Sequence, residues 1–228
     1  MIASDLWQFP ETLVAFRAHF ADNAAPWEWV RRIAVALKAL DWSNYPLRTD
    51  LPPGVHVKGQ VYLHPTVKLP PYAVIEGPCW IGPECDIRPS AYIRGNVIAA
   101  RGCTLGNSCE YKNALLLDGV ETAHFNYVGD TVLGNKAHLG AGVICANLKL
   151  ARDEVLVTTA ADSRVETGLR KLGALVGDAA EVGCNSVLQP GTILGPRSAV
   201  ISMPFHGYLA PDTLVRVKQQ FGFMKRPR

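Results

Sequence analysis

The chain has 228 residues, of which 48% are hydrophobic and 19% are charged, a composition typical of a globular protein rather than a disordered one. Its formal net charge of +3 is too small to favour nucleic acid as a partner, although it would tolerate a phosphorylated or nucleotide ligand. Neither a signal peptide nor an apolar run of about 20 residues is recognisable, so we expect a cytoplasmic protein that does not enter a membrane.

Residues 1–50 are predicted to form a helical N-terminal cap. Pro10 could open one helix and Pro26 another, because proline is tolerated at the first helical position. The second candidate carries an apolar stripe at helical spacing, Val30, Ile33, Leu37 and Leu40. We expect this stripe to be core, and the helices to cap the following domain and cover its exposed strand edge.

A six-residue repeat occupies most of residues 51–205. An aliphatic residue recurs at nearly every sixth position from Val57 to Ala123, and again from Val176 to Val200. A smaller residue often precedes it by two positions. Neither a helix period of 3.6 nor a strand period of 2 produces this spacing. The repeat predicts a mainly β solenoid, in which each hexad forms one flat side of a triangular coil and both series point inward.

Cysteine and glycine both follow the repeat. Four of the six cysteines lie in phase in the small-residue series, at Cys79, Cys85, Cys103 and Cys109, and no C-x-x-C pair occurs. We interpret them as small buried apolar residues in a reducing compartment. Glycine often follows the aliphatic residue, as in Ile81-Gly82, where we expect it to permit a turn conformation that other residues resist.

The repeat is interrupted twice. Its phase slips between Ala123 and Leu133, and it disappears between Cys145 and Ala174. The second interruption contains a charged stretch, residues 148–173, which we expect to be an inserted arm containing a β-hairpin. Insertions in a solenoid emerge as loops on one side, often the binding side. Residues 206–228 are predicted to form a C-terminal helical extension, with a helix from Pro211 to about Phe221.

Residues outside the repeat are the candidates for chemistry. Arg94 and Lys112 are 18 residues apart, which is one coil of three hexads, so they are expected to stack about 4.8 Å apart on one face. Two stacked cations favour an anionic ligand, such as a phosphate, between them. His124 lies nearby and could accept a proton at neutral pH. The alternative is a surface histidine beside two solvated cations. For His138 a structural role is favoured.

The stretch from Cys109 through Ala123-His124-Phe125-Asn126-Tyr127-Val128-Gly129-Asp130 to Cys145-Ala146-Asn147 resembles a known family. It is similar to the acetyltransferase domain of the bifunctional enzyme that makes UDP-N-acetylglucosamine. The arm ending in residues 168–173 resembles that of related sugar-1-phosphate nucleotidylyltransferases. The resemblance implies a left-handed parallel β-helix, a homotrimer, and acetyl transfer from acetyl-CoA to glucosamine 1-phosphate, with no metal in the catalytic step.

The resemblance also implies roles for individual residues. It assigns the catalytic base to His124, and phosphate binding to Arg94 and Lys112. Tyr127 and Asn147 match residues that contact the sugar. Ala141 matches a position whose backbone meets acetyl-CoA, and Cys184 falls where a serine near the cofactor is usual. The implied mechanism is direct transfer, in which the sugar amine attacks the thioester while His124 accepts its proton, without a cysteine nucleophile.

The sequence departs from the family pattern in several places. His138 stands where asparagine is usual, and Leu148 replaces an aromatic residue. The lysine that the family carries after Asn147 could correspond to Lys149, Arg152 or Lys171. About 50 partly helical residues stand where the nucleotidyltransferase half would be. The acceptor could therefore be a different amino sugar, or a nucleotide-linked one.

Two other functions are compatible with a repeat of this kind. A zinc enzyme of the carbonic-anhydrase-like β-helix type needs three histidine ligands, two of them close in sequence. His124 has no such partner a few residues on, since His138 is 14 positions away. A non-catalytic trimeric scaffold or regulator is the other alternative. The presence of Arg94, Lys112, His124 and Tyr127 together argues against it.

Overall fold

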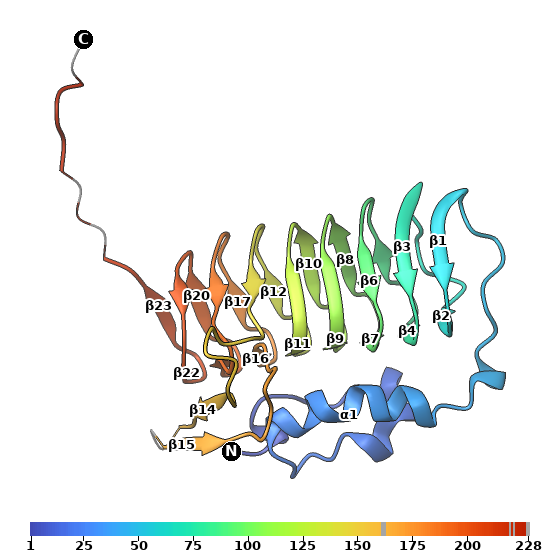
Figure 1. The fold of residues 1–228 in the computed structure, drawn as a ribbon, viewed down its shortest axis with the longest axis horizontal. Helices are drawn as coiled ribbons and strands as arrows, with labels where there is room; N and C mark the ends of the chain where they lie inside the picture. Colours follow the sequence, from blue (N-terminus) through green and yellow to red (C-terminus); the bar gives the residue numbers. More distant parts are fainter. Residues whose placement is uncertain (161–162, 219, 221, 227–228) are drawn as a thin grey trace.

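The computed structural model describes residues 1–228 except 161–162, 219, 221 and 227–228. Its main body is a parallel β-solenoid of about nine turns, seen side-on in Figure 1. This confirms the mainly β, repeat-built fold that the six-residue spacing predicts. No helix among the described residues is long and apolar enough to cross a membrane.

The coils stack their strands into three flat faces. The first face contains β1 (Gly54–Lys58), β3 (Tyr72–Glu76), β6 (Tyr92–Arg94), the first part of β9 (Glu110–Leu116), the first part of β11 (Tyr127–Leu133), β13 (Ile144–Cys145), β18 (Val187–Leu188) and β21 (Pro204–Phe205). The second contains β2 (Val61–Leu63), β4 (Cys79–Ile81), β7 (Val97–Ala99), the later parts of β9 and β11, β16 (Leu175–Val176), β19 (Ile193–Leu194) and β22 (Tyr208–Leu209). The third contains β5 (Asp86–Ile87), β8 (Thr104–Asn107), β10 (Glu121–His124), β12 (His138–Leu139), β17 (Glu181–Val182), β20 (Ala199–Ile201) and β23 (Leu214–Arg216).

The interior is filled by the aliphatic and small columns that the repeat predicts. Ile75, Ile81 and Ile87 are buried, and so are the four in-phase cysteines. The first predicted phase slip is present, and a second one precedes it. Interior Tyr111 is followed by Leu116 in the aliphatic column, five positions on, and Val128 is followed by Leu133 in the same way. The column therefore shortens within the predicted interval, and also once before it. The neighbouring coils then take 17 residues instead of 18, as the pairs of Glu121 with Thr104 and with His138 show.

The glycines that follow the aliphatic residues have a different purpose from the one expected. Left-handed backbone falls elsewhere at the corners, on residues such as Asn96 and Asn113, with φ of 54° and 49°. At Gly140 a side chain would collide with the next coil, because an added Cβ would lie 2.7 Å from the backbone nitrogen of Cys184. Close stacking of coils, not turn conformation, therefore requires glycine there.

The N-terminal segment lies along the second face rather than capping the end of the coil (Figure 1). It comprises η1 (Ala3–Asp5), η2 (Glu11–His19), α1 (Pro26–Ala39) and η3 (Trp42–Asn44), so the helix predicted from Pro26 is confirmed and the one after Pro10 is a 3-10 helix. Val30, Ile33 and Leu37 pack against an outward-facing apolar column of the second face. That column is Trp80, Ile98, Leu115, Val132, Leu175 and Ile193. Burying it removes a long apolar surface from water.

The arm is confirmed and the C-terminal helix is not. The arm contains the antiparallel pair β14 (Leu156–Thr158) and β15 (Arg164–Glu166), and its Val155, Val157 and Leu172 are buried together with the N-terminal segment. At the C-terminus, Leu214–Arg216 forms β23 and pairs in parallel with β20. Val215 packs on the interior column, so this stretch continues the coil instead of forming a helix. The end of the predicted helix, near Phe221, lies outside the described residues.

Candidate functional site

The residues predicted to carry chemistry gather along the two long edges of the first face. One edge is the corner where β9 and β11 bend into the second face, and it carries Lys112, Asp130 and Asn147. The opposite edge, where the third face meets the first, carries His124. Tyr127 begins β11 on the first face between these edges. The phase slip and the arm both occur at this part of the coil, which sets it apart from the regular repeat.

A buried carboxylate organises the first edge. Asp130 is 5% exposed, and its backbone has a left-handed φ of 47°. Its carboxylate accepts two hydrogen bonds from Lys112 Nζ, at 3.0 and 2.9 Å, one from Asn113 Nδ2 at 2.9 Å and one from Asn147 Nδ2 at 2.5 Å. Asn147 Nδ2 also lies 3.2 Å from the Tyr127 hydroxyl. Burial raises the pKa of that hydroxyl, so Tyr127 is neutral and able to donate at physiological pH.

The two predicted phosphate-binding cations are each paired with a carboxylate of the protein. Arg94 lies one coil before Lys112, as the register of β6 with β9 requires. Its guanidinium bonds to Glu110 at 2.7 Å, and this hydrogen bond raises the pKa of Arg94. Lys112 is engaged by Asp130. The chain itself therefore supplies a counter-charge to each cation, and their stacking does not by itself require an anionic ligand.

The opposite edge brings together the predicted base and cofactor residues. His124 ends β10, is exposed, and makes no side-chain hydrogen bond within the described part of the chain. Its carbonyl accepts a bond of 3.0 Å from the backbone N–H of Gly142, and the carbonyl of Ala141 accepts one of 2.8 Å from Asn185. Cys184, which is exposed, precedes Asn185. His124, Ala141 and Cys184 thus lie on successive coils of one corner.

The structure separates the three candidates for the lysine that follows Asn147. Lys149 pairs with Asp153 at 3.0 Å within the arm. Lys171 instead lines a cavity with Asn113 and Asp130. Arg152 lines neither this cavity nor the one that contains Lys149. Of the three, Lys171 is therefore the one placed beside the polar cluster.

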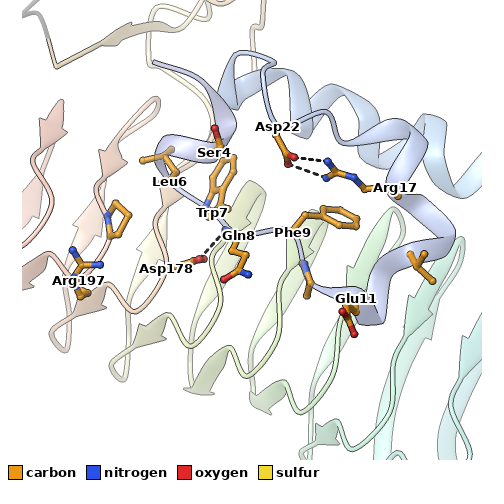
Figure 2. Close-up of a pocket in the computed structure, with 13 residues that line it drawn as sticks. Ser4, Leu6, Trp7, Gln8, Phe9, Glu11, Arg17, Asp22, Asp178 and Arg197 are labelled. Carbon is orange, nitrogen blue, oxygen red and sulfur yellow. Dashed lines mark hydrogen bonds and ion pairs between the residues drawn. The ribbon is translucent and has the colours of Figure 1, made fainter.

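Another cavity, of about 610 Å³, lies between the N-terminal segment and the corner of the second and third faces (Figure 2). Trp7 and Phe9 line it, together with Asp178, and none of the predicted site residues does. Asp178 accepts hydrogen bonds from the backbone N–H groups of Gln8 and Asn135, at 2.9 and 2.7 Å. Burial raises the pKa of the Asp178 carboxyl. These contacts fasten the N-terminal segment to the coil.

The sequence predicted no role for Asp130, Asn113 or Glu110. Asp130 and Glu110 pair with the predicted residues Lys112 and Arg94, and Asn113 donates to Asp130. Asp130 could have been identified as a candidate site residue, because it belongs to the motif that carries the family resemblance. Glu110 and Asn113 flank Lys112 on either side, and only the register across coils reveals their partners. Within the described ranges, no group of three or more histidine, cysteine, aspartate or glutamate residues is arranged to hold a metal.

Comparison with known proteins matches a segment that contains most of the predicted site residues. Residues 75–165 match the family model of the GMPPB C-terminal domain, which covers the central coils and most of the arm. This segment contains Arg94, Lys112, His124, Tyr127, Ala141 and Asn147. The chain is thus similar over this range to the GMPPB C-terminal domain.

Curated relatives agree with this similarity. The chain is 34% identical over 96 residues to a bifunctional sugar-1-phosphate nucleotidylyltransferase/acetyltransferase of Sulfurisphaera tokodaii, covering 42% of the chain and 24% of that protein. It is 31% identical over 105 residues to the bifunctional protein GlmU of Methanococcus maripaludis, covering 46% of the chain and 25% of GlmU. The matched stretch spans about a quarter of each relative. A solved Bacillus cereus structure, assigned as an acetyltransferase, aligns with 69% of the chain and 75% of its own, at 16% identity and a TM-score of 0.37.

Proposed function

We propose that this protein is an acetyl-CoA-dependent N-acetyltransferase acting on a phosphorylated or nucleotide-linked amino sugar, such as glucosamine 1-phosphate. The observation that carries the proposal is the arrangement on the first face. An exposed histidine lies at one edge, beside the predicted cofactor residues, and a preorganised cluster of polar side chains lies at the other. The relative from Sulfurisphaera tokodaii, which is named a bifunctional sugar-1-phosphate nucleotidylyltransferase/acetyltransferase, supports the same chemistry.

In the proposed reaction the amine of the sugar attacks the thioester carbonyl of acetyl-CoA. A C–N bond forms, the C–S bond breaks, and the amine proton passes to the His124 imidazole and then to the departing CoA sulfur. The His124 imidazole is exposed and makes no side-chain hydrogen bond within the described residues, so a substrate amine can approach it. Tyr127 and Asn147 would contact the sugar, and Ala141 and Cys184 would lie near acetyl-CoA.

The proposal also covers the oligomeric state and the cofactor. We propose a cytoplasmic homotrimer, in which neighbouring subunits approach at the uncovered faces, because the N-terminal segment already occupies the second face. Acetyl-CoA is the only cofactor proposed, as a co-substrate, and the catalytic step uses no metal. Sedimentation velocity at several protein concentrations measures the subunit number directly.

The experiment measures CoA release with a thiol reagent, using acetyl-CoA and a panel of amino sugars that includes glucosamine 1-phosphate. His124→Ala should lower turnover about 100-fold or more. His138→Ala is the matched control, because His138 is also exposed but starts its third-face strand, away from the corner where His124 lies, in register between Glu121 and Glu181. Reactions without acceptor account for the exposed Cys184 thiol.

The second candidate function is a non-catalytic scaffold. The neutralisation of Arg94 by Glu110 and of Lys112 by Asp130 favours it, since a site that binds phosphate would profit from free cations. Calorimetry with CoA separates the two functions. Absence of both CoA binding and turnover with every acceptor would reject the acetyltransferase and leave the scaffold.

A further inference from the structure

A cavity of about 500 Å³ lies beside the polar cluster, between α1, the end of the arm and the corner of the first and second faces. We call it the α1–arm cavity. The coil contributes Asn113 and Asp130 to its lining. The arm contributes Leu169, Arg170 and Lys171, and α1 contributes Arg31. Two segments that are distant in the sequence, α1 and the arm, therefore bring three cationic side chains to one hollow beside the coil.

The charge of this cavity is unbalanced. Asp130 is the carboxylate among its lining residues, and Lys112 and two asparagines already engage it. Arg170 and Lys171 are exposed, and neither forms an ion pair within the described residues. Arg94 and Lys112 are in the opposite situation, because each already bonds to a carboxylate. The uncompensated positive charge near the site thus lies on the arm, not on the coil.

The arm is held firmly enough to place these cations. Leu172 N–H donates to the Asn147 carbonyl at 3.0 Å, and Leu148 and Lys171 form a β-bridge. Thr167 Oγ1 donates to the Val155 carbonyl at 2.6 Å. On the helix side, the Arg31 guanidinium bonds to the Thr167 carbonyl and to Glu28 at 3.1 Å. The turn that carries Arg170 and Lys171 is therefore fixed to Asn147 and α1 together.

Resting on the proposed function, we propose that the α1–arm cavity is the subsite for the phosphoryl group of the acceptor. Arg170 and Lys171 bind the phosphoryl oxygens with charge-assisted hydrogen bonds, in place of Arg94 and Lys112, to which the resemblance assigns that role. Arg31 is a positioning residue that holds the arm. The N-terminal segment is then part of the acceptor site, although it lies outside the matched segment of the chain. A phosphate monoester and a sugar diphosphate share this chemistry.

The test is calorimetric titration of the full chain with inorganic phosphate and, separately, with inorganic pyrophosphate. Wild-type protein should bind one of them, and tighter binding of pyrophosphate would assign a diphosphate-linked acceptor. Arg170→Gln and Lys171→Gln should each weaken binding about tenfold, and the double variant more. Arg164→Gln, an exposed arginine on β15 outside the cavity, is the matched control and should bind as wild type does.

Two results would overturn the proposal. Binding that is lost in Arg94→Gln while the Arg170→Gln/Lys171→Gln double variant binds normally would place the phosphoryl group on the coil. Absence of phosphate and pyrophosphate binding by wild type would also overturn it. For Arg31, Arg31→Gln should weaken phosphate binding and Arg31→Lys should restore it, with CoA affinity unchanged in both.

The proposed function is tested separately, by CoA release in the same variants. Turnover with an unchanged acceptor KM in Arg170→Gln/Lys171→Gln would reject the subsite and leave the acetyltransferase. Phosphate binding that depends on Arg170 and Lys171, without any acetyl transfer, would keep the subsite and reject the acetyltransferase.

Discussion

Lys112 donates hydrogen bonds to both carboxylate oxygens of Asp130, at 3.0 and 2.9 Å, from one coil to the next. Asp130 is almost completely buried, whereas the Lys112 side chain is 27% exposed. The loss of stability therefore depends on which partner is removed. Removing the lysine strands a buried charge, which costs more than the pair itself contributes.

This asymmetry predicts the effect of Lys112→Ala on stability. The variant should lose about 3 kcal/mol of unfolding free energy in urea denaturation, because Asp130 keeps only its asparagine donors. Lys112→Ala combined with Asp130→Asn should recover part of that loss. Equal destabilisation by the single and the double variant would contradict the account.

The packing of the N-terminal segment on the second face predicts that Leu115→Ala is costly. Leu115 faces outward from the coil, yet it is buried beneath that segment. The variant should lose about 3 kcal/mol by creating a cavity there. Val74→Ala is the control, since Val74 also faces outward but is 40% exposed on the uncovered first face. A loss under 1 kcal/mol is expected for that control, by the same denaturation measurement.

Asp178 predicts a pH dependence of stability. Burial raises the pKa of its carboxyl in the folded protein. Between the ordinary carboxyl pKa and this raised value the folded state binds more protons than the unfolded state, so its contribution to stability falls as pH rises through that window. Subtracting the urea-denaturation profile of Asp178→Asn from that of wild type isolates this contribution. Stability contributed by Asp178 that increases with pH in that window would refute the assignment.

The cysteines predict a simple count of reactive thiols. Five of the six are buried and only Cys184 is exposed. Burial raises the pKa of Cys145 to about 12 and that of Cys109 above its usual range, which disfavours the reactive thiolate. A thiol reagent should therefore modify one cysteine rapidly in the native protein and six in denaturant.

Cys184→Ser should abolish the rapid phase of thiol modification. CoA should slow the modification of wild-type Cys184 if this residue lies near the cofactor, as proposed. Modification at an unchanged rate in saturating CoA would remove Cys184 from the cofactor site. An unrelated nucleotide such as inosine monophosphate at the same concentration is the control for non-specific protection.

Much of the fold could be predicted because the repeat is a local property of the sequence. Inward positions such as Ile75 and Ile81 recur at a period that neither a helix nor an isolated strand produces, so the coil follows from spacing alone. The helix from Pro26 also has a local origin, in its proline and its apolar stripe. The prediction of a C-terminal helix was wrong because Val215 continues the interior column. That placement depends on packing against the preceding coil rather than on local sequence.

The outward column that receives the N-terminal segment was present in the sequence but went unrecognised. Each residue of this column directly precedes an interior residue of the second face, as Trp80, Ile98 and Leu115 do. Only the stacking of coils aligns them into one outward apolar column. The site shows the same division. The motif around His124 and Tyr127 identified candidate residues, but the partners of Arg94 and Lys112 come from neighbouring coils and could not be assigned from spacing.

The sequence by itself determined the coil, its interior columns, the inserted arm and the residues that carry the family resemblance. Tertiary structure alone decided that Glu110 and Asp130 neutralise the predicted cations, and that Arg31, Arg170 and Lys171 meet at one cavity. The physical reason is the distance along the chain over which each kind of interaction acts. Repeat spacing and helix propensity act over a few residues, whereas ion pairs and cavities are formed by side chains that the stacking of coils brings together from distant parts of the chain.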